Sequence, residues 1–224
     1  PPDVSHFNGE PGAGRIETEN LTTQIRLEQA LSDNWNLDLG LQRTLGSLYG
    51  GAVQQGTLQA DRRTVSRSYQ LRDFHDSSKL AQAFLRGKAR LAGIEHRILA
   101  GIEYASSEST SLFLRPSNPA AYPLNIDVYD PVYGAPLPPR SALSGSPTDS
   151  VSHTRALVVQ DQIHITSRLS TLVGLRLDKY ETSSLNNANG VTTTYKKDAL
   201  TPTLGLSYAF NDAVDVAVLK PVAT

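Results

Sequence analysis

A proline-rich segment carries the residues whose types best suit ligand binding. It reads "FLRPSNPAAYPLNIDVYDPVYGAP" and contains Phe113, Arg115, Tyr122, Tyr129 and Tyr133. Aromatic faces and a few hydrogen-bond donors suit a compact polar ligand with an apolar rim. The segment therefore predicts ligand contacts. The alternative is that these side chains only pack the segment against its neighbours.

The residue types that serve most often in catalysis and metal binding have no suitable spacing. The histidines show no metal-ligand pattern: His6, His75, His96, His153 and His164. His153 follows aspartate and serine in "PTDSVSHT", but adjacency in sequence is not the geometry of a catalytic triad. The glycines of "GEPGAG" and "LYGG" do not join a strand to a helix, as phosphate-binding glycines do. The sequence therefore predicts no enzyme, no metal site and no bound cofactor.

The composition excludes further classes. The formal net charge is −1 and the cationic residues are scattered, which argues against a nucleic-acid partner. The absence of cysteine removes disulfides and thiol chemistry. No run reaches the roughly 18 apolar residues of a transmembrane helix. This absence does not exclude a membrane β-barrel, because the strands of such a barrel have roughly 9–11 residues and are only half apolar.

Residues alternate between polar and apolar in paired segments, which predicts β-hairpins. In "LSTLVGLRLD", residues 169–178, most apolar side chains fall on one face and Arg176 and Asp178 on the other. Similar pairs join residues 21–28 to 35–42, 79–92 to 95–105 and 200–210 to the last residues, each across a short turn. A helix over residues 77–91 is the alternative for one arm, because its residues are good helix formers.

The connections alternate between short turns and long segments. The long ones are residues 45–76, within which residues 64–71 are a candidate strand extension, and residues 106–152 and 183–198. Successive connections of an antiparallel barrel lie at opposite rims, so this alternation predicts an all-β, antiparallel transmembrane β-barrel with about eight strands in four hairpins, short periplasmic turns and long extracellular loops. Trp35 follows a short turn, where an interfacial aromatic girdle would lie. A complete small barrel with a structural or adhesion role and a soluble all-β binding module are the alternatives.

Several stretches resemble the TonB-dependent siderophore receptors. In that family a Gln-Asp-Gln-like strand end turns into a Gly-x-Arg-x-Asp strand, followed by a Thr-Pro-x-x-Gly-Leu strand and an Asn-Asp turn. The matching positions here are Gln160-Asp161-Gln162, Gly174/Arg176/Asp178, Thr201-Pro202/Gly205-Leu206 and Asn211-Asp212. "GEPGAGRIETENLTTQIRLEQALSDNWNLDLGLQ" is similar to a further hairpin of the family, and "IDVYDPVYGAPLPP" to a loop of its ferrichrome-type branch. The resemblance covers most of the chain.

This resemblance implies uptake of a ferric siderophore across the bacterial outer membrane, within outer-membrane lipid and coupled to the TonB system. The family's barrel has roughly 22 strands around a plugged lumen. Residues 1–224 are expected to be part of that barrel domain, with a long extracellular loop at about 106–152. No stretch resembles the plug domain or a TonB box, "VAVLKPVAT" departs from the family's aromatic strand, and both ends read as cuts in a longer chain.

The resemblance also implies roles for the residues of interest. A siderophore already fills the coordination sphere of iron, so the protein needs no metal ligand. The aromatic and cationic residues of the proline-rich segment are then the expected ligand contacts. Residues expected to face the lumen would form a charge-paired wall or contact a plug: Arg97, Glu103, Arg176 and Asp178.

Overall fold

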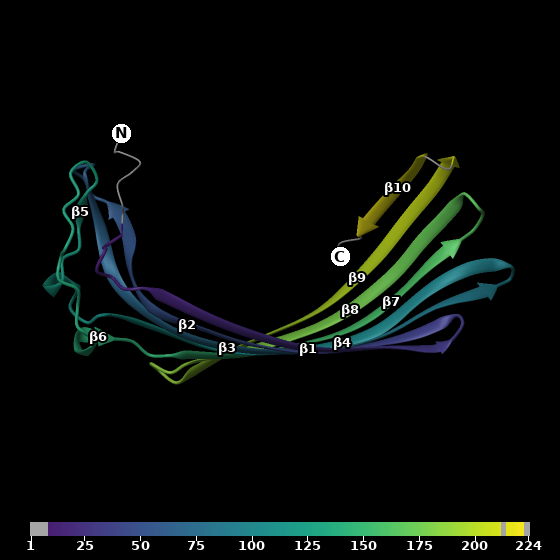
Figure 1. The fold of residues 1–224 in the computed structure, drawn as a ribbon, viewed down its shortest axis with the longest axis horizontal. Helices are drawn as coiled ribbons and strands as arrows, with labels where there is room; N and C mark the ends of the chain where they lie inside the picture. Colours follow the sequence, from purple (N-terminus) through teal and green to yellow (C-terminus); the bar gives the residue numbers. More distant parts are fainter. Residues whose placement is uncertain (1–8, 212–213, 222–224) are drawn as a thin grey trace.

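The fold is one antiparallel sheet, seen in a computed structural model that describes residues 9–211 and 214–221. Eight strands follow one another in chain order across the sheet (Figure 1). Two further strands of two residues each, β5 and β6, pair with β3 and β4. The elements are β1 (Ile16–Ser32), β2 (Trp35–Leu58), β3 (Thr64–Leu91), β4 (Ile94–Pro116), η1 (Pro119–Ala121), β5 (Ile126–Asp127), η2 (Arg140–Ala142), β6 (Leu143–Ser144), β7 (Thr148–His164), β8 (Leu169–Asn186), β9 (Val191–Asn211) and β10 (Val214–Pro221). The expected all-β antiparallel architecture is confirmed, and the helix considered for residues 77–91 is wrong because β3 covers them.

The strands are longer than the sequence predicts. β3 has 28 residues, roughly three times the length that crosses a bilayer. Most of the expected connections 45–76 and 183–198 are therefore strand, joined across residues 59–63 and 187–190. The expected loop 106–152 shrinks to residues 117–147. The sequence does not show these extensions as strands, because their residues are mostly polar. Outside the apolar band neither face of the sheet has to be apolar, so the alternation of polar and apolar residues is lost there.

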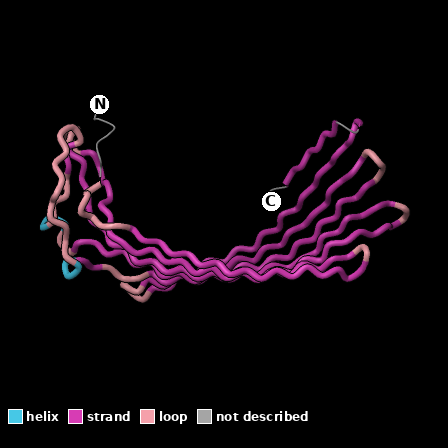
Figure 2. The backbone as a smooth tube through the Cα atoms, viewed as in Figure 1, coloured by secondary structure: helices cyan, strands magenta, loops and turns pink. Residues whose placement is uncertain are grey.

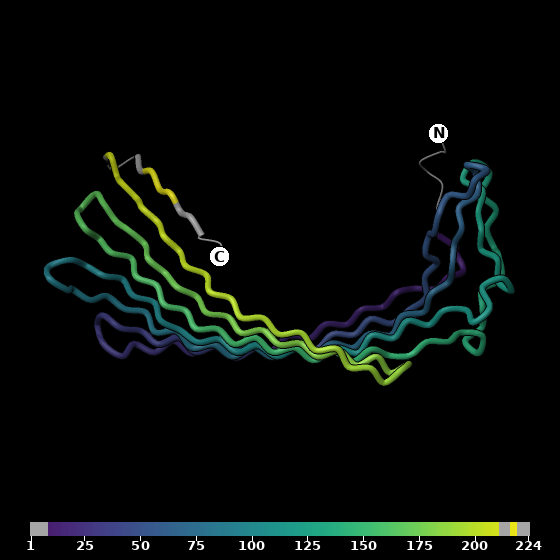
Figure 3. The backbone as a smooth tube through the Cα atoms, turned by 180° about the vertical axis from the view of Figure 1, so that it is seen from behind, coloured from purple at the N-terminus to yellow at the C-terminus, as the bar shows by residue number. Residues whose placement is uncertain are grey.

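The two ends of the sheet differ. The short turns lie together at the right of Figure 1, and the long loop with β5 and β6 lies at the left. Figure 2 shows the long loop segments at that same end, and Figure 3 shows the strands running from one end to the other. In one short turn Ala92 and Gly93 both have positive φ, 49° and 84°. Two such residues match the type I′ turn that closes tight hairpins. The expected Asn211-Asp212 turn lies partly outside the described residues. His6 also lies outside them.

One face of the sheet carries an apolar band. Register partners on seven adjacent strands give the row Leu27, Leu39, Ala83, Ile102, Leu157, Leu177 and Leu200. All but Ala83 are exposed large apolar side chains. No soluble sandwich leaves such a band uncovered, because burying it drives the packing of the sheet. Among the described residues, no helix is long and apolar enough to span a membrane.

The sheet is open. β1 and β10 lie at opposite ends of the strand order, and all residues of β1 are exposed. The described strands therefore do not close into the small eight-stranded barrel that the sequence left as an alternative. They form an arc with two edges.

A small core fastens the long loop to the sheet. Leu71 of β3, Leu114 of β4 and Leu143 of β6 form a buried cluster, with Tyr69 and Leu112 packed against it. Leu124 and Ile126 of the loop are also buried. Leucine and isoleucine, rather than the loop tyrosines, thus supply most of the apolar anchors of this loop.

Candidate functional site

The polar face carries an aromatic and cationic group at the loop end of the sheet. Phe74 of β3 and Phe113 of β4 meet edge to face, with ring centroids 4.7 Å apart. The Arg115 guanidinium lies 5.5 Å from the centroid of the Phe113 ring. Arg72 is the register partner of Phe113, and its Nε is buried without a hydrogen-bond partner. We call Arg72, Phe74, Phe113 and Arg115 the aromatic platform.

Strand alternation explains why these four residues share a face. In β3, Arg72 and Phe74 are separated from Gln82 and Arg86 by even numbers of residues, so all four lie on the polar face. In β4, Phe113 and Arg115 share that face with Glu103 for the same reason. Two of the five expected ligand contacts, Phe113 and Arg115, are thus on a strand rather than in the loop.

The remaining expected contacts lie elsewhere in the loop. Tyr129 is exposed, and the Arg63 guanidinium lies 5.5 Å from the centroid of its ring. Arg63 also pairs with Asp127, at 2.7 Å from Nη2 to Oδ2. Tyr122 and Tyr133 are half-buried. Of the five expected ligand contacts, Phe113 and Arg115 therefore contact each other, whereas Tyr129 belongs to a separate group with Arg63 and Asp127.

Phe74 and Arg72 are the residues that sequence reasoning missed. They fall in the segment expected to be a polar connection. The signal was weak, because in "LRDFHDSSKLAQAF" Phe74 and Phe84 share a face with Leu80 but aspartate, serine and glutamine fill its other positions, 76, 78 and 82. Strand pairing with β2 and β4 decides the conformation there.

Charged side chains pair across the middle of the polar face. Arg176 Nη1 donates to Glu103 Oε2 at 2.6 Å, and its Nε donates to Asp178 Oδ2 at 2.9 Å. A second network centres on Asp38, which accepts from Arg86 Nε at 2.6 Å. Arg97 stands apart, because it pairs with Glu95 near a short turn, at 3.0 Å. Three of the four residues expected to face the lumen thus form one network.

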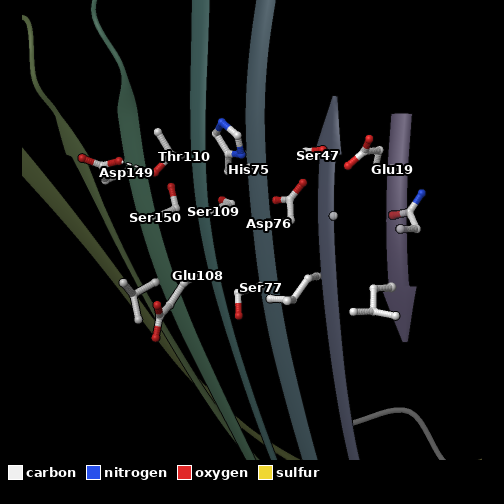
Figure 4. A pocket seen from close by; sticks show the side chains of 15 residues that line it. Glu19, Ser47, His75, Asp76, Ser77, Glu108, Ser109, Thr110, Asp149 and Ser150 are labelled. Atoms are coloured by element: carbon white, nitrogen blue, oxygen red, sulfur yellow. Dashed lines mark hydrogen bonds between the residues drawn. The ribbon is translucent and has the colours of Figure 1, made fainter. Parts of the chain in front are cut away.

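An acidic cavity lies beyond the apolar band, and strand alternation puts most of its lining residues on the apolar face, opposite the aromatic platform. It has a volume of about 810 Å³ and crosses β1, β2, β3, β4 and β7. Figure 4 shows Glu19, Asp76, Glu108 and Asp149 among its labelled side chains. His75 Nε2 lies 3.0 Å from Asp73 Oδ1. Asp149 Oδ1 accepts a hydrogen bond from the Thr110 hydroxyl at 2.7 Å. Over the described ranges no group of three metal-ligating side chains forms.

An uncovered apolar band, a polar face with paired charges and an outer rim of long strands define the wall of a transmembrane β-barrel. Comparison with known proteins assigns the family. Residues 2–218 match the family described as "TonB dependent receptor-like, beta-barrel", so the chain belongs to the TonB-dependent receptors. Members of this family are outer-membrane transport receptors rather than enzymes, and they bind TonB and ferric siderophores or other metal complexes.

Relatives are similar over most of this chain. The metal-pseudopaline receptor CntO of Pseudomonas aeruginosa strain UCBPP-PA14 is 35% identical over 212 residues, which is 91% of this chain and 29% of that protein. The siderophore receptor PiuA of Acinetobacter baumannii has a TM-score of 0.79 at 18% identity, covering 91% of this chain and 32% of PiuA. The open form of the ferric-catecholate import receptor Fiu of E. coli K12 has a TM-score of 0.80 at 17% identity, covering 95% and 36%. The chain thus spans about a third of the length of these relatives.

Proposed function

We propose that this chain forms part of the wall of an outer-membrane receptor that imports a metal chelate, with a ferric siderophore as the expected ligand. The observation that carries the proposal is the aromatic platform on the polar face. Two aromatic rings and two guanidiniums suit a chelate that offers apolar rims and anionic oxygens. Import would be driven by the TonB system, through a plug outside these 224 residues.

The position of the platform supports ligand capture. It lies on the polar face, beyond the paired charges of Glu103 and Arg176 and toward the long loop. A ligand arriving from outside would meet it before the middle of the barrel. Exposed Tyr129 and half-buried Tyr122 and Tyr133 would add aromatic contacts from the loop. Leu124 and Ile126 are buried apolar side chains of this loop segment.

A test uses the full-length gene product in a host that lacks its own siderophore receptors. Phe74→Ala and Phe113→Ala are each expected to raise the Kd for a ferric siderophore such as ferrichrome by about 5- to 30-fold, or about 1–2 kcal/mol. Arg115→Gln is expected to act similarly. Tyr49→Ala is the matched control, because Tyr49 is an exposed aromatic on the opposite face of β2. Unchanged binding in all three variants would remove the platform from ligand recognition.

A second candidate ligand is a metal–pseudopaline complex. The 35% identity to a metal-pseudopaline receptor favours it, whereas the siderophore receptors PiuA, Fiu and BauA are 18%, 17% and 20% identical to this chain. Uptake assays with radioactive iron as ferrichrome and with a radioactive metal as the pseudopaline complex separate the two ligands. Import of neither complex by cells that carry the receptor in their outer membrane would contradict both.

A further inference from the structure

A second group of aromatic and cationic side chains lies on β8 and β9. The ring centroids of Tyr180 and Tyr195 are 6.3 Å apart, and both residues are exposed. Lys197 is the register partner of Tyr180. Among the described residues no carboxylate forms an ion pair with Lys197, whereas its neighbour Lys196 binds Glu181 at 2.7 Å. We call Tyr180, Tyr195 and Lys197 the inner aromatic group.

Strand alternation and register place this group on the polar face. In β8, Tyr180 is separated from Arg176 and Asp178 by even numbers of residues, so it shares their face. Lys197 lies on the same face because it is directly opposite Tyr180, and Tyr195 lies two residues from Lys197 along β9. The inner aromatic group therefore borders the Arg176 network, on the side that faces the long loop.

A row of hydroxyl groups continues from Tyr195 across the polar face. Successive register partners, which we call the hydroxyl row, are Thr182, Ser152, Ser107, Ser78 and Thr44. A cavity of about 340 Å³ adjoins this row, and its lining includes Ser78, Ser107 and Ser152 together with Gln42 and Thr154. Hydroxyl and amide groups both donate and accept hydrogen bonds. The row thus offers an oxygen-rich ligand a polar surface without a fixed charge.

The hydroxyl row is separate from the aromatic platform. Phe113 lies six residues beyond Ser107 on β4, and a strand rises about 3.3 Å per residue, so about 20 Å separates them. Glu103 of the Arg176 network lies four residues from Ser107 in the other direction. A compact chelate held at the platform therefore does not reach the inner aromatic group, which lies farther along the way to the middle of the barrel.

We propose that the inner aromatic group and the hydroxyl row form a second binding site for the imported metal chelate, between the aromatic platform and the Arg176 network. The inference rests on the proposed function. The Tyr180 and Tyr195 rings can stack on the apolar rim of an oxygen-rich chelate, while the Lys197 ammonium and the hydroxyl groups donate to its oxygens. A chelate that leaves the platform is then held again before it passes the charged wall.

The test separates binding at the platform from passage through the second site. The full-length gene product is produced in a host that lacks its own siderophore receptors, and uptake is normalised to the receptor found in the outer membrane. The probes are radioactive iron as ferrichrome and a radioactive metal as the pseudopaline complex. Tyr180→Ala/Tyr195→Ala and Lys197→Gln are each expected to lower the maximal uptake rate about 5-fold, with the Kd on cells without an active TonB system within about 2-fold of wild type.

Residues on the opposite face of β9 provide matched controls. Lys196→Gln removes the neighbouring cation, and Tyr208→Ala removes another exposed ring of the same strand. Both controls are expected to import at the wild-type rate. Tyr195→Ala alone is a milder variant, because most of this residue is exposed, and it is expected to lower uptake in the same direction. An equal decrease in the controls would overturn the second site, because the loss would then reflect the stability of the wall.

Separate readouts distinguish failure of this inference from failure of the proposed function. An unchanged maximal uptake rate in both site variants overturns the second site alone. A Kd raised as far as in Phe113→Ala would also overturn it, because Tyr180 and Tyr195 would then belong to the first binding step. A wild-type receptor that reaches the outer membrane but binds and imports neither complex contradicts the proposed function, and this result appears without any variant.

Discussion

Arg67 and Glu10 form an ion pair that is shielded from solvent, with Nη2 3.1 Å from Oε2 and side chains 0% and 1% exposed. Arg67 lies on β3 and also donates to the carbonyl oxygens of Gly9 and Leu124. Glu10 accepts from the Gly134 amide at 2.6 Å. This one pair therefore connects the N-terminal segment, a barrel strand and both halves of the long loop.

Removal of Arg67 should release the loop. Arg67→Ala leaves a buried carboxylate and two carbonyl groups without their donor, and losing one partner of a buried pair costs about 3–5 kcal/mol. We expect limited proteolysis of the full-length gene product to cut within residues 117–147 at least 10-fold faster. Arg140→Ala, an exposed arginine of the same loop, is the control. Equal cleavage rates for the two variants would show that the pair does not hold the loop.

The Arg176 network should depend most on its cation. Arg176 lies between Glu103 and Asp178, so Arg176→Gln leaves two carboxylates facing each other, whereas Glu103→Gln leaves one intact pair. The Arg176 side chain is 40% exposed, so its loss should cost only about 1 kcal/mol. Guanidinium unfolding of the detergent-solubilised receptor measures both variants. A larger effect of Glu103→Gln would contradict this account.

Gly101 should resist substitution because Phe84 lies over it. A Cβ at position 101 would collide with the Phe84 ring and with the Ala83 carbonyl, so Gly101→Ala should destabilise the receptor by about 1–3 kcal/mol. Gly174→Ala is the matched control on β8, where an added Cβ would meet its nearest atom, Thr203 Cβ, at 3.5 Å. Thermal unfolding compares the two. Equal melting temperatures would mean that Phe84 moves aside at little cost.

The tip between β2 and β3 should stay ordered in mild acid. Hydrogen bonds from the Thr64 hydroxyl, the Thr64 amide and the Arg63 amide lower the pKa of Asp61 to about 2 from 3.8. A lowered folded-state pKa gives stabilisation that is fully present above 3.8 and is lost as the pH falls through about 2. Hydrogen exchange at the Thr64 amide should therefore show constant protection from pH 7 to about 4.5, after correction for intrinsic rates. In Asp61→Asn this protection should be lower at every pH, and a midpoint near pH 5 in wild type would contradict the assignment.

The 224-residue chain alone should not form a stable barrel. β1 and β10 leave two open edges, and each unpaired backbone group costs several kcal/mol in lipid. We expect the isolated chain to aggregate or to stay protease-sensitive in detergent, whereas the full-length gene product should give a heat-modifiable band on a gel. A monodisperse isolated chain with cooperative unfolding would show that the two edges find another way to pair.

Local order could be predicted from the sequence because strands and tight turns depend on neighbouring residues. Period-two alternation in residues 169–178 and the turns near Asn34 and Gly93 are local signals, and the structure confirms them. The alternation of short and long connections predicted the barrel, which period-two alternation alone could not distinguish from a sandwich, and the family resemblance agreed with it. The strand extensions through Phe74 and Phe113 could not be predicted, because beyond the apolar band the alternation fades and only pairing with neighbouring strands holds the backbone extended.

Relations between distant residues came only from the tertiary structure. Alternation places Arg43 and Lys79 on unspecified faces, and strand register makes them opposite neighbours. Arg67 and Glu10 are 57 positions apart, and no local pattern marks them as partners. Register and loop packing are collective properties of several strands. The sequence alone therefore determined the central parts of the strands, the short turns and the family, whereas the aromatic platform, the buried pair and the charge networks of the polar face depended on the assembled sheet.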